Sequence, residues 1–82
     1  MRFDVLLHEL RLYKSRSQAA AAIQSGAALL DGVAVKPSRE THTGQHISIV
    51  ARGERRNLEI LELPHGSVSK GKARALVREI PA

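Results

Sequence analysis

The chain has 82 residues, no cysteine and a formal net charge of +5. A domain this short has a small core and little room for a deep substrate pocket, and the missing cysteines exclude disulfides, thiolate catalysis and cysteine-based zinc sites. Thirteen Lys and Arg against eight Asp and Glu favour a polyanionic partner such as a nucleic acid.

Two helices are expected near the N-terminus. The first is indicated by apolar side chains that recur at helical spacing over about residues 3–12, namely Phe3, Leu6, Leu7 and Leu10. The sequence Ser15-Arg16-Ser17-Gln18 matches a capping box, in which Ser15 caps a second helix and Gln18 reaches back to the Ser15 amide. Gly26 is well placed to end that helix in a left-handed conformation.

The pattern then changes to that of short strands. Asp31-Gly32 separates the apolar runs 28–30 and 33–35, which predicts a hairpin with a two-residue turn. Residues 46–50 alternate and residues 58–63 stop at Pro64, so both are expected to be strands. Residues 52–57 are expected to form a charged loop and residues 73–80 a short helix.

The expected fold is therefore α+β, with two N-terminal helices packed on a small, mainly antiparallel sheet of about four strands. Residues 1–63 are expected to form the domain, and residues 64–82 a short basic tail.

Basic and hydroxyl side chains gather in and around the predicted helix pair and after the predicted hairpin. If the hairpin packs beside the helices, these groups converge on one face, where the free amides at the start of the second helix and the neighbouring cations suit phosphate. The alternative is a solvated, charged edge of the turn with no ligand. The candidate RNA-binding residues are Arg2, Arg11, Lys14, Ser15, Arg16, Ser17, Gln18, Lys36, Ser38 and Arg39.

The order of these motifs resembles the S-four RNA-binding domain, also called the alpha-L motif. The resemblance covers about residues 2–51 and rests on Arg2-Phe3-Asp4, Lys14-Ser15-Arg16-Ser17-Gln18-Ala19, Ile23 with Gly26, Asp31-Gly32, Val35-Lys36-Pro37-Ser38, and Gly44 with the strand after it. Phe3, Asp31 and Gln45 depart from the usual Leu, Asn and Asp without threatening the fold. The resemblance implies an RNA surface on or near Arg2, Lys14, Ser15, Arg16, Gln18 and Lys36.

The chain beyond residue 51 is similar to small stand-alone members of this superfamily, above all the ribosome-associated heat-shock protein fifteen family, because a strand and a basic tail follow instead of a catalytic domain. That likeness implies the large ribosomal subunit as partner, and a role with stalled subunits that still carry tRNA and a nascent chain.

The composition also indicates the type of RNA. Phe3 and Tyr13 are the only aromatic residues, whereas proteins that bind single strands stack successive bases on aromatic side chains. A protein that recognises the shape and phosphates of folded RNA is therefore expected. The resemblance implies that this RNA is rRNA or tRNA, and the protein is expected to be a monomer. Two alternatives remain open, a protein-interaction module and an RNA-binding accessory subunit of a separate RNA-modifying enzyme.

We expect no catalytic activity, no cofactor and no metal. Ala73 stands where a phosphate-binding P-loop needs Ser or Thr, and the four scattered histidines have no third ligand at a suitable spacing. Asp4 and His8 interrupt the first apolar stretch too early for a signal peptide, and no apolar run approaches the ~20 residues that span a bilayer. A cytoplasmic protein without a membrane partner is expected.

Overall fold

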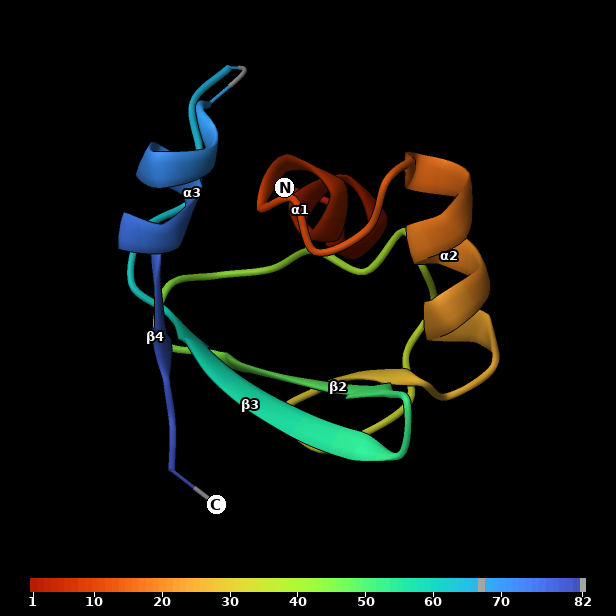
Figure 1. The fold of residues 1–82 in the computed structure, drawn as a ribbon. Coiled ribbons are helices and arrows are strands. Elements are labelled where there is room, and N and C mark those ends of the chain that lie inside the picture. Colours follow the sequence, from red (N-terminus) through yellow and green to blue (C-terminus); the bar gives the residue numbers. More distant parts are fainter. Residues whose placement is uncertain (67, 82) are drawn as a thin grey trace.

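The computed structural model describes residues 1–66 and 68–81; Ser67 and Ala82, both in the expected tail, lie outside the described residues. The elements in chain order are α1 (Phe3–Glu9), α2 (Arg16–Gln24), β1 (Ala28–Leu30), β2 (His46–Ala51), β3 (Glu54–Ile60), α3 (Lys70–Ala75) and β4 (Val77–Glu79). The strands form one antiparallel sheet in the order β1-β2-β3-β4. The helices lie on one side of this sheet (Figure 1). The expected α+β fold is confirmed.

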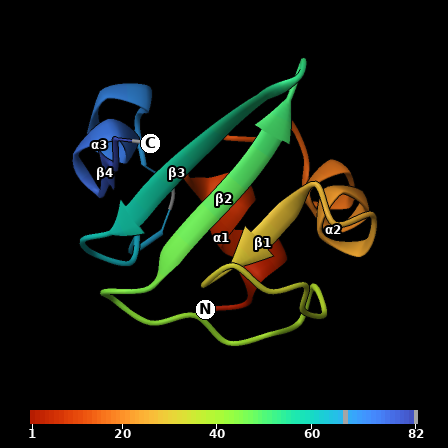
Figure 2. The same cartoon turned by 90° about the horizontal axis from the view of Figure 1, so that it is seen from below.

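The core lies between the helices and the sheet. Seen from the sheet side, α1 lies behind the middle of the sheet and α2 and α3 flank it (Figure 2). Every layer contributes fully buried side chains, and the largest are Phe3, Leu6, Leu7, Ile23, Leu30, Ile47, Leu58, Ile60 and Thr41. Leu76, which follows α3, is also buried in this core. The segment from Val68 to Val77 is thus packed into the same body as the N-terminal helices.

The first helix is shorter than expected, because α1 ends at Glu9 and not near residue 12. Arg11 has a φ of 60°, and its amide donates to the carbonyl of His8 while that of Leu12 donates to Leu7. This is the Schellman arrangement that closes many helices. The left-handed position is usually glycine, so an arginine there gives no sign of the helix end in the sequence.

The second helix begins and ends as expected. Ser15 caps α2, and Gly26 has a φ of 82°. The amides of Gly26 and Ala27 donate to the carbonyls of Ile23 and Ala22, which is the same closure as in α1. The two helices also pack directly against each other.

The predicted turn at Asp31-Gly32 is present, but the hairpin around it is not. Both residues have positive φ, 50° and 78°, as a type I′ turn requires. Beyond a single bridge between Leu30 and Val33, residues 33–35 form no strand, and Val33 is exposed. The expectation of a second arm was wrong because β1 pairs with β2 instead, while the chain after Val33 turns toward the start of α1.

The C-terminal half also differs from the expectation. Residues 54–57, expected in a charged loop, belong to β3, so only Arg52-Gly53 turns the chain between β2 and β3. The strand expected over 58–63 ends at Ile60, and the helix expected over 73–80 is replaced by α3 and β4. Pairing with neighbouring strands outweighs local charge and helix pattern in these segments. Within residues 1–66 and 68–81, no helix has the length and apolar character needed to cross a membrane.

Candidate nucleic-acid interface

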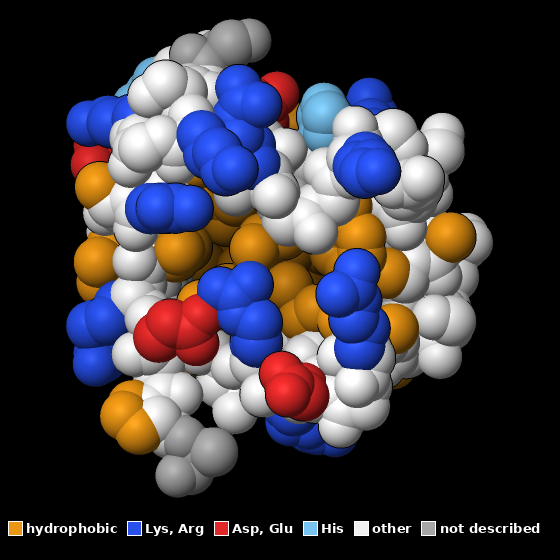
Figure 3. Space-filling view, viewed as in Figure 1, with side chains coloured by type: hydrophobic (Ala, Val, Ile, Leu, Met, Phe, Trp, Pro, Cys, Tyr) orange, Lys and Arg blue, Asp and Glu red, His pale blue; other side chains and the backbone are white. Residues whose placement is uncertain are grey.

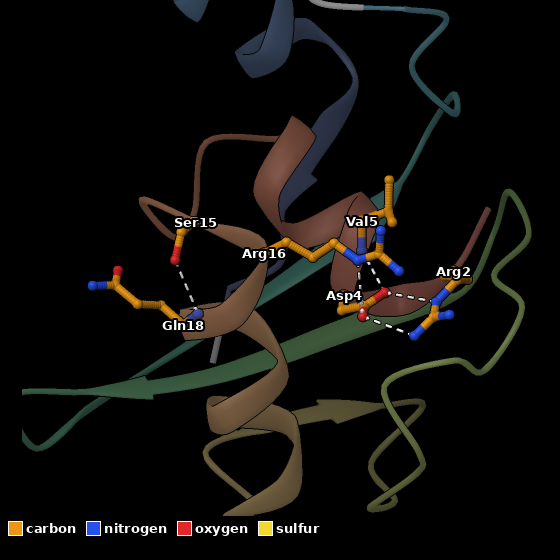
Figure 4. Close-up of polar contacts among 6 residues, drawn as sticks. All are labelled: Arg2, Asp4, Val5, Ser15, Arg16 and Gln18. Atoms are coloured by element: carbon orange, nitrogen blue, oxygen red, sulfur yellow. Dashed lines mark hydrogen bonds and ion pairs between the residues drawn. The ribbon is translucent and has the colours of Figure 1, made fainter.

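The N-terminus of α2 is exposed and only partly satisfied by the protein. The Ser15 Oγ accepts a hydrogen bond from the Gln18 amide at 3.1 Å, as the capping motif predicts. Among the hydrogen bonds of the described residues, none occupies the amides of Arg16 and Ser17, which precede the first intrahelical bond. The Gln18 side chain extends away from Ser15 (Figure 4), so the expected return bond does not form. These two amides and the helix dipole are suited to an anion.

Replacing Ser15 with alanine is expected to lower the free energy of unfolding by about 1 kcal/mol, because the Gln18 amide then loses its acceptor. Ser17→Ala is the matched control, since Ser17 is exposed in the same turn and its loss is expected to change stability by less than about 0.5 kcal/mol. Urea denaturation of both variants measures the difference. Equal stabilities would show that Ser15 does not cap α2.

Asp4 connects the starts of α1 and α2. Its carboxylate accepts two hydrogen bonds from the Arg2 guanidinium at 3.1 Å and one from the Arg16 Nε at 3.4 Å (Figure 4). Its third donor is the amide of Val5, at 2.8 Å. Asp4 is 3% exposed, whereas 43% of the Arg2 side chain and 54% of the Arg16 side chain are exposed. The buried carboxylate thus holds two arginines that remain open to solvent.

The electrostatics of Asp4 follow from these contacts. Burial by itself raises the pKa of its carboxyl, but the hydrogen bonds from Arg2, from the Val5 amide and from Arg16 together outweigh burial and hold the pKa below its ordinary value of 3.8. Asp4 is therefore charged at neutral pH. It neutralises only part of the positive charge of the two arginines, since one carboxylate faces two guanidinium groups.

An open groove of about 590 Å³ adjoins this contact. Arg16, Ala20 and Gln24 are spaced four residues apart and so share one face of α2; Ala20 and Gln24 form one wall of the groove. We call it the Asp4 groove, and the residues that line it are Arg2, Asp4, Ala20, Gln24, Val35, Lys36, Pro37 and Ser38. The side chain of Lys36 makes no hydrogen bond or ion pair within the described part of the chain.

The segment after β1 completes this surface and covers the start of α1. The carbonyls of Arg39 and Pro37 accept hydrogen bonds from the amides of Phe3 and Asp4 at 2.9 and 3.1 Å. The first amides of α1 are therefore occupied, unlike those of α2. Of the two N-terminal helices, α2 is therefore the one whose start presents backbone donors and cations to solvent together.

The predicted site residues fall into two groups. Arg2, Lys36 and Ser38 line the Asp4 groove, Arg16 reaches it through Asp4, and Ser15, Ser17 and Gln18 form the adjacent first turn of α2. Arg39 is exposed and contributes its carbonyl to α1. Arg11 and Lys14 do not join this group, because they lie beyond the other end of α1 and line a separate hollow.

Asp4 is not among the candidate residues that the sequence indicated, although it holds two of them. The spacing of Arg2 and Asp4 in one motif was a usable signal. In the part of the chain that the structure describes, no cluster of three or more His, Asp or Glu side chains is arranged to hold a metal ion.

The family model of the S4 domain matches residues 1–47, more than half of the chain. The chain belongs to the S4 domain family. The match spans α1, α2, β1 and the whole segment that builds the Asp4 groove. S4 domains are RNA-binding modules. The membership that the sequence motifs indicated is thereby confirmed. No curated protein matches the chain.

A solved structure extends the likeness beyond the S4 domain. The structure of Vibrio cholerae Heat Shock Protein 15, described as trimeric, has a TM-score of 0.91 and 26% sequence identity to this chain. The match covers 98% of this chain and 81% of the Vibrio chain. It therefore includes β3, α3 and β4, which lie outside the S4 domain match, and it confirms the similarity to the heat-shock protein fifteen family.

Proposed function

We propose that this protein binds structured RNA through the start of α2 and the Asp4 groove, without catalysing a reaction on it. Free backbone amides, two exposed arginines held by one buried carboxylate, and Lys36 lie on one surface of an S4 domain. The single observation that carries the proposal is the Asp4 contact, because it fixes Arg2 and Arg16 beside open helix amides without neutralising both. Guanidinium groups held in this way suit phosphate oxygens.

The aromatic residues favour folded RNA over single strands. Phe3 is completely buried and Tyr13 is half-buried. No row of exposed rings is therefore present on which successive bases would stack. Phosphate contacts then supply most of the affinity, with weak dependence on base sequence and a steep dependence on salt.

The double variant Arg16→Ala, Lys36→Ala is expected to bind an RNA hairpin about tenfold or more weakly than the unchanged protein at physiological salt. The slope of log affinity against log salt is expected to fall by about two, one for each lost phosphate contact. Fluorescence anisotropy over a salt series, with circular dichroism to confirm folding, gives both quantities.

The control is Arg55→Ala, Lys72→Ala, which removes the same two residue types from exposed positions outside the Asp4 groove. If both double variants lose the same affinity, net charge alone explains binding and the proposed site is wrong. If neither changes RNA binding, a protein-interaction role becomes the better reading of this surface.

The proposal extends to the ribosome. The likeness to Heat Shock Protein 15 supports an rRNA or tRNA ligand, the large ribosomal subunit as partner and a cytoplasmic role with stalled subunits. We propose that the protein acts there as a monomer. Sedimentation of cell extract at moderate salt tests the partner, and absence from large-subunit fractions would exclude it. Sedimentation equilibrium of the purified chain tests the monomer against a trimeric assembly.

A further inference from the structure

A second basic surface lies at the other end of α1. The end of α1, α3 and β3 enclose a groove lined by Leu10, Arg11, Leu12, Arg56, Lys70 and Arg74. An adjoining hollow adds Tyr13 and Lys14. We call both together the Leu12 groove. In the view of Figure 3, hydrophobic side chains form the floor of a hollow in the middle of this face, and Lys and Arg side chains gather around it.

The cations of this groove come from distant parts of the chain. The Arg11 guanidinium donates two hydrogen bonds to the carbonyl of Val68, at 2.9 and 3.2 Å. This contact joins the left-handed turn after α1 to the segment that leads into α3. Arg11 adopts a φ of 60°, an uncommon backbone conformation for a non-glycine residue. The fold thus fixes Arg11 in place beside the cations of α3.

The charge of the groove is largely uncompensated. Arg56 is paired with Glu79. Within the described residues, the side chains of Lys14, Lys70 and Arg74 make neither hydrogen bonds nor ion pairs. No carboxylate is among the described residues that line the groove. A polyanion is the partner that this balance fits.

This surface is separate from the Asp4 groove. Arg2 precedes α1 and Arg11 follows it, so the length of the helix, roughly 10 Å at 1.5 Å per residue, lies between them. The Asp4 groove is built from the segment after β1, whereas the Leu12 groove is built from α3 and β3. The two grooves share no lining residue, so different phosphate groups can occupy them.

We propose that the Leu12 groove is a second RNA-phosphate surface, so that one molecule holds two RNA segments at once. This inference rests on the proposed function, since it requires RNA to be the ligand of the first surface. RNA is favoured over an acidic protein segment because cations outnumber the aliphatic side chains of the floor, and because Lys14 directly precedes the Ser15 cap of the RNA-binding helix.

The test is isothermal titration calorimetry of the full chain with a short RNA hairpin. Wild type is expected to bind two equivalents. The double variant Lys70→Ala, Arg74→Ala is expected to bind one equivalent. The binding step that is present in wild type and missing in this variant gives the affinity of the Leu12 groove. Lys72→Ala, on the same helix but outside the groove, is expected to retain two equivalents. Arg2→Ala, Lys36→Ala is expected to lose the other equivalent.

The outcomes separate the two proposals. One equivalent in wild type, unchanged by Lys70→Ala, Arg74→Ala, overturns the second surface and leaves the proposed function intact. Two equivalents that survive this double variant overturn it as well, and then the groove is left for an acidic protein segment. If wild type binds no hairpin, the proposed function itself fails, and the inference fails with it.

Discussion

Asp4→Asn is expected to weaken RNA binding about tenfold, although it raises the net charge by one. The carboxylate orders the Arg2 and Arg16 side chains, and an amide offers them one acceptor instead of two charged oxygens. Ordering a long side chain on binding costs about 0.5–1.5 kcal/mol, so two released arginines account for about a tenfold loss. Fluorescence anisotropy with a structured RNA measures it.

Glu40→Gln is the matched control for this substitution. Glu40 is an exposed carboxylate whose ion-pair partner is the N-terminal amino group, so its neutralisation changes the net charge equally without releasing either arginine. RNA affinity is expected to stay the same or to rise in this variant. A rise in RNA affinity in both variants would show that net charge determines the affinity and that the fixed positions of the two arginine side chains do not.

Asp4→Asn is also expected to lower the stability of the fold, by an amount that depends on pH. Because the pKa of Asp4 lies below its ordinary value of 3.8 in the folded protein, ionised Asp4 stabilises the fold at neutral pH. Hydrogen bonds to charged groups contribute about 1.5–3 kcal/mol, so Asp4→Asn is expected to lose about that much at pH 7. The advantage of wild type is expected to disappear as the pH falls through the folded pKa, which urea denaturation at successive pH values measures.

Leu76→Ala is expected to lower the free energy of unfolding by about 2–5 kcal/mol. Leu76 is 2% exposed and belongs to the common core, so truncation leaves a cavity under α3 and removes apolar contacts. A domain of this size has roughly 5–15 kcal/mol in total, so the variant is expected to be close to unfolding. Denaturant unfolding monitored by circular dichroism gives the value.

Leu61→Ala is the control, because Leu61 is the same residue type at 47% exposure. Its truncation is expected to change stability by less than about 0.5 kcal/mol. If Leu76→Ala changed the free energy of unfolding as little as Leu61→Ala, the segment after residue 63 would be a dispensable tail. A large difference would instead define residues 64–82 as part of the folding unit.

Local chemistry explains which elements were predictable. Ser15, Gly26 and Asp31-Gly32 act through their own backbone and immediate neighbours, so their residue types reveal the helix start, the helix end and the turn. The end of α1 was missed because Arg11 occupies a left-handed position that usually identifies itself by glycine.

Long-range pairing explains the elements that were not predictable. Arg55 and Arg56 were expected in a loop because their segment is charged, yet they pair with Val50 and Ile49 in the β2–β3 ladder. Val77 reads as a continuation of a helix, and becomes a strand because Ile60 offers an open sheet edge. Strand formation depends on such partners more than on intrinsic preference.

The candidate site shows the same division. The start of α2 and its cations were predictable, since cap and charges lie within a few residues. The Asp4 contact joins residues 12 positions apart and the Arg11–Val68 contact joins residues 57 apart. Neither leaves a periodic pattern, so the sequence alone placed Arg11 and Lys14 on the same surface as Arg2.

The strand order has a consequence for association between molecules. The two long strands, β2 and β3, lie in the centre of the sheet, and the edges are the three-residue strands β1 and β4. Short edges expose few unpaired backbone groups and so discourage pairing with the sheet of another molecule. Detachment of β4 would uncover part of the seven-residue β3 as a longer open edge. The C-terminal strand is therefore expected to limit pairing with the sheet of another molecule along residues 58–60, as well as closing the core.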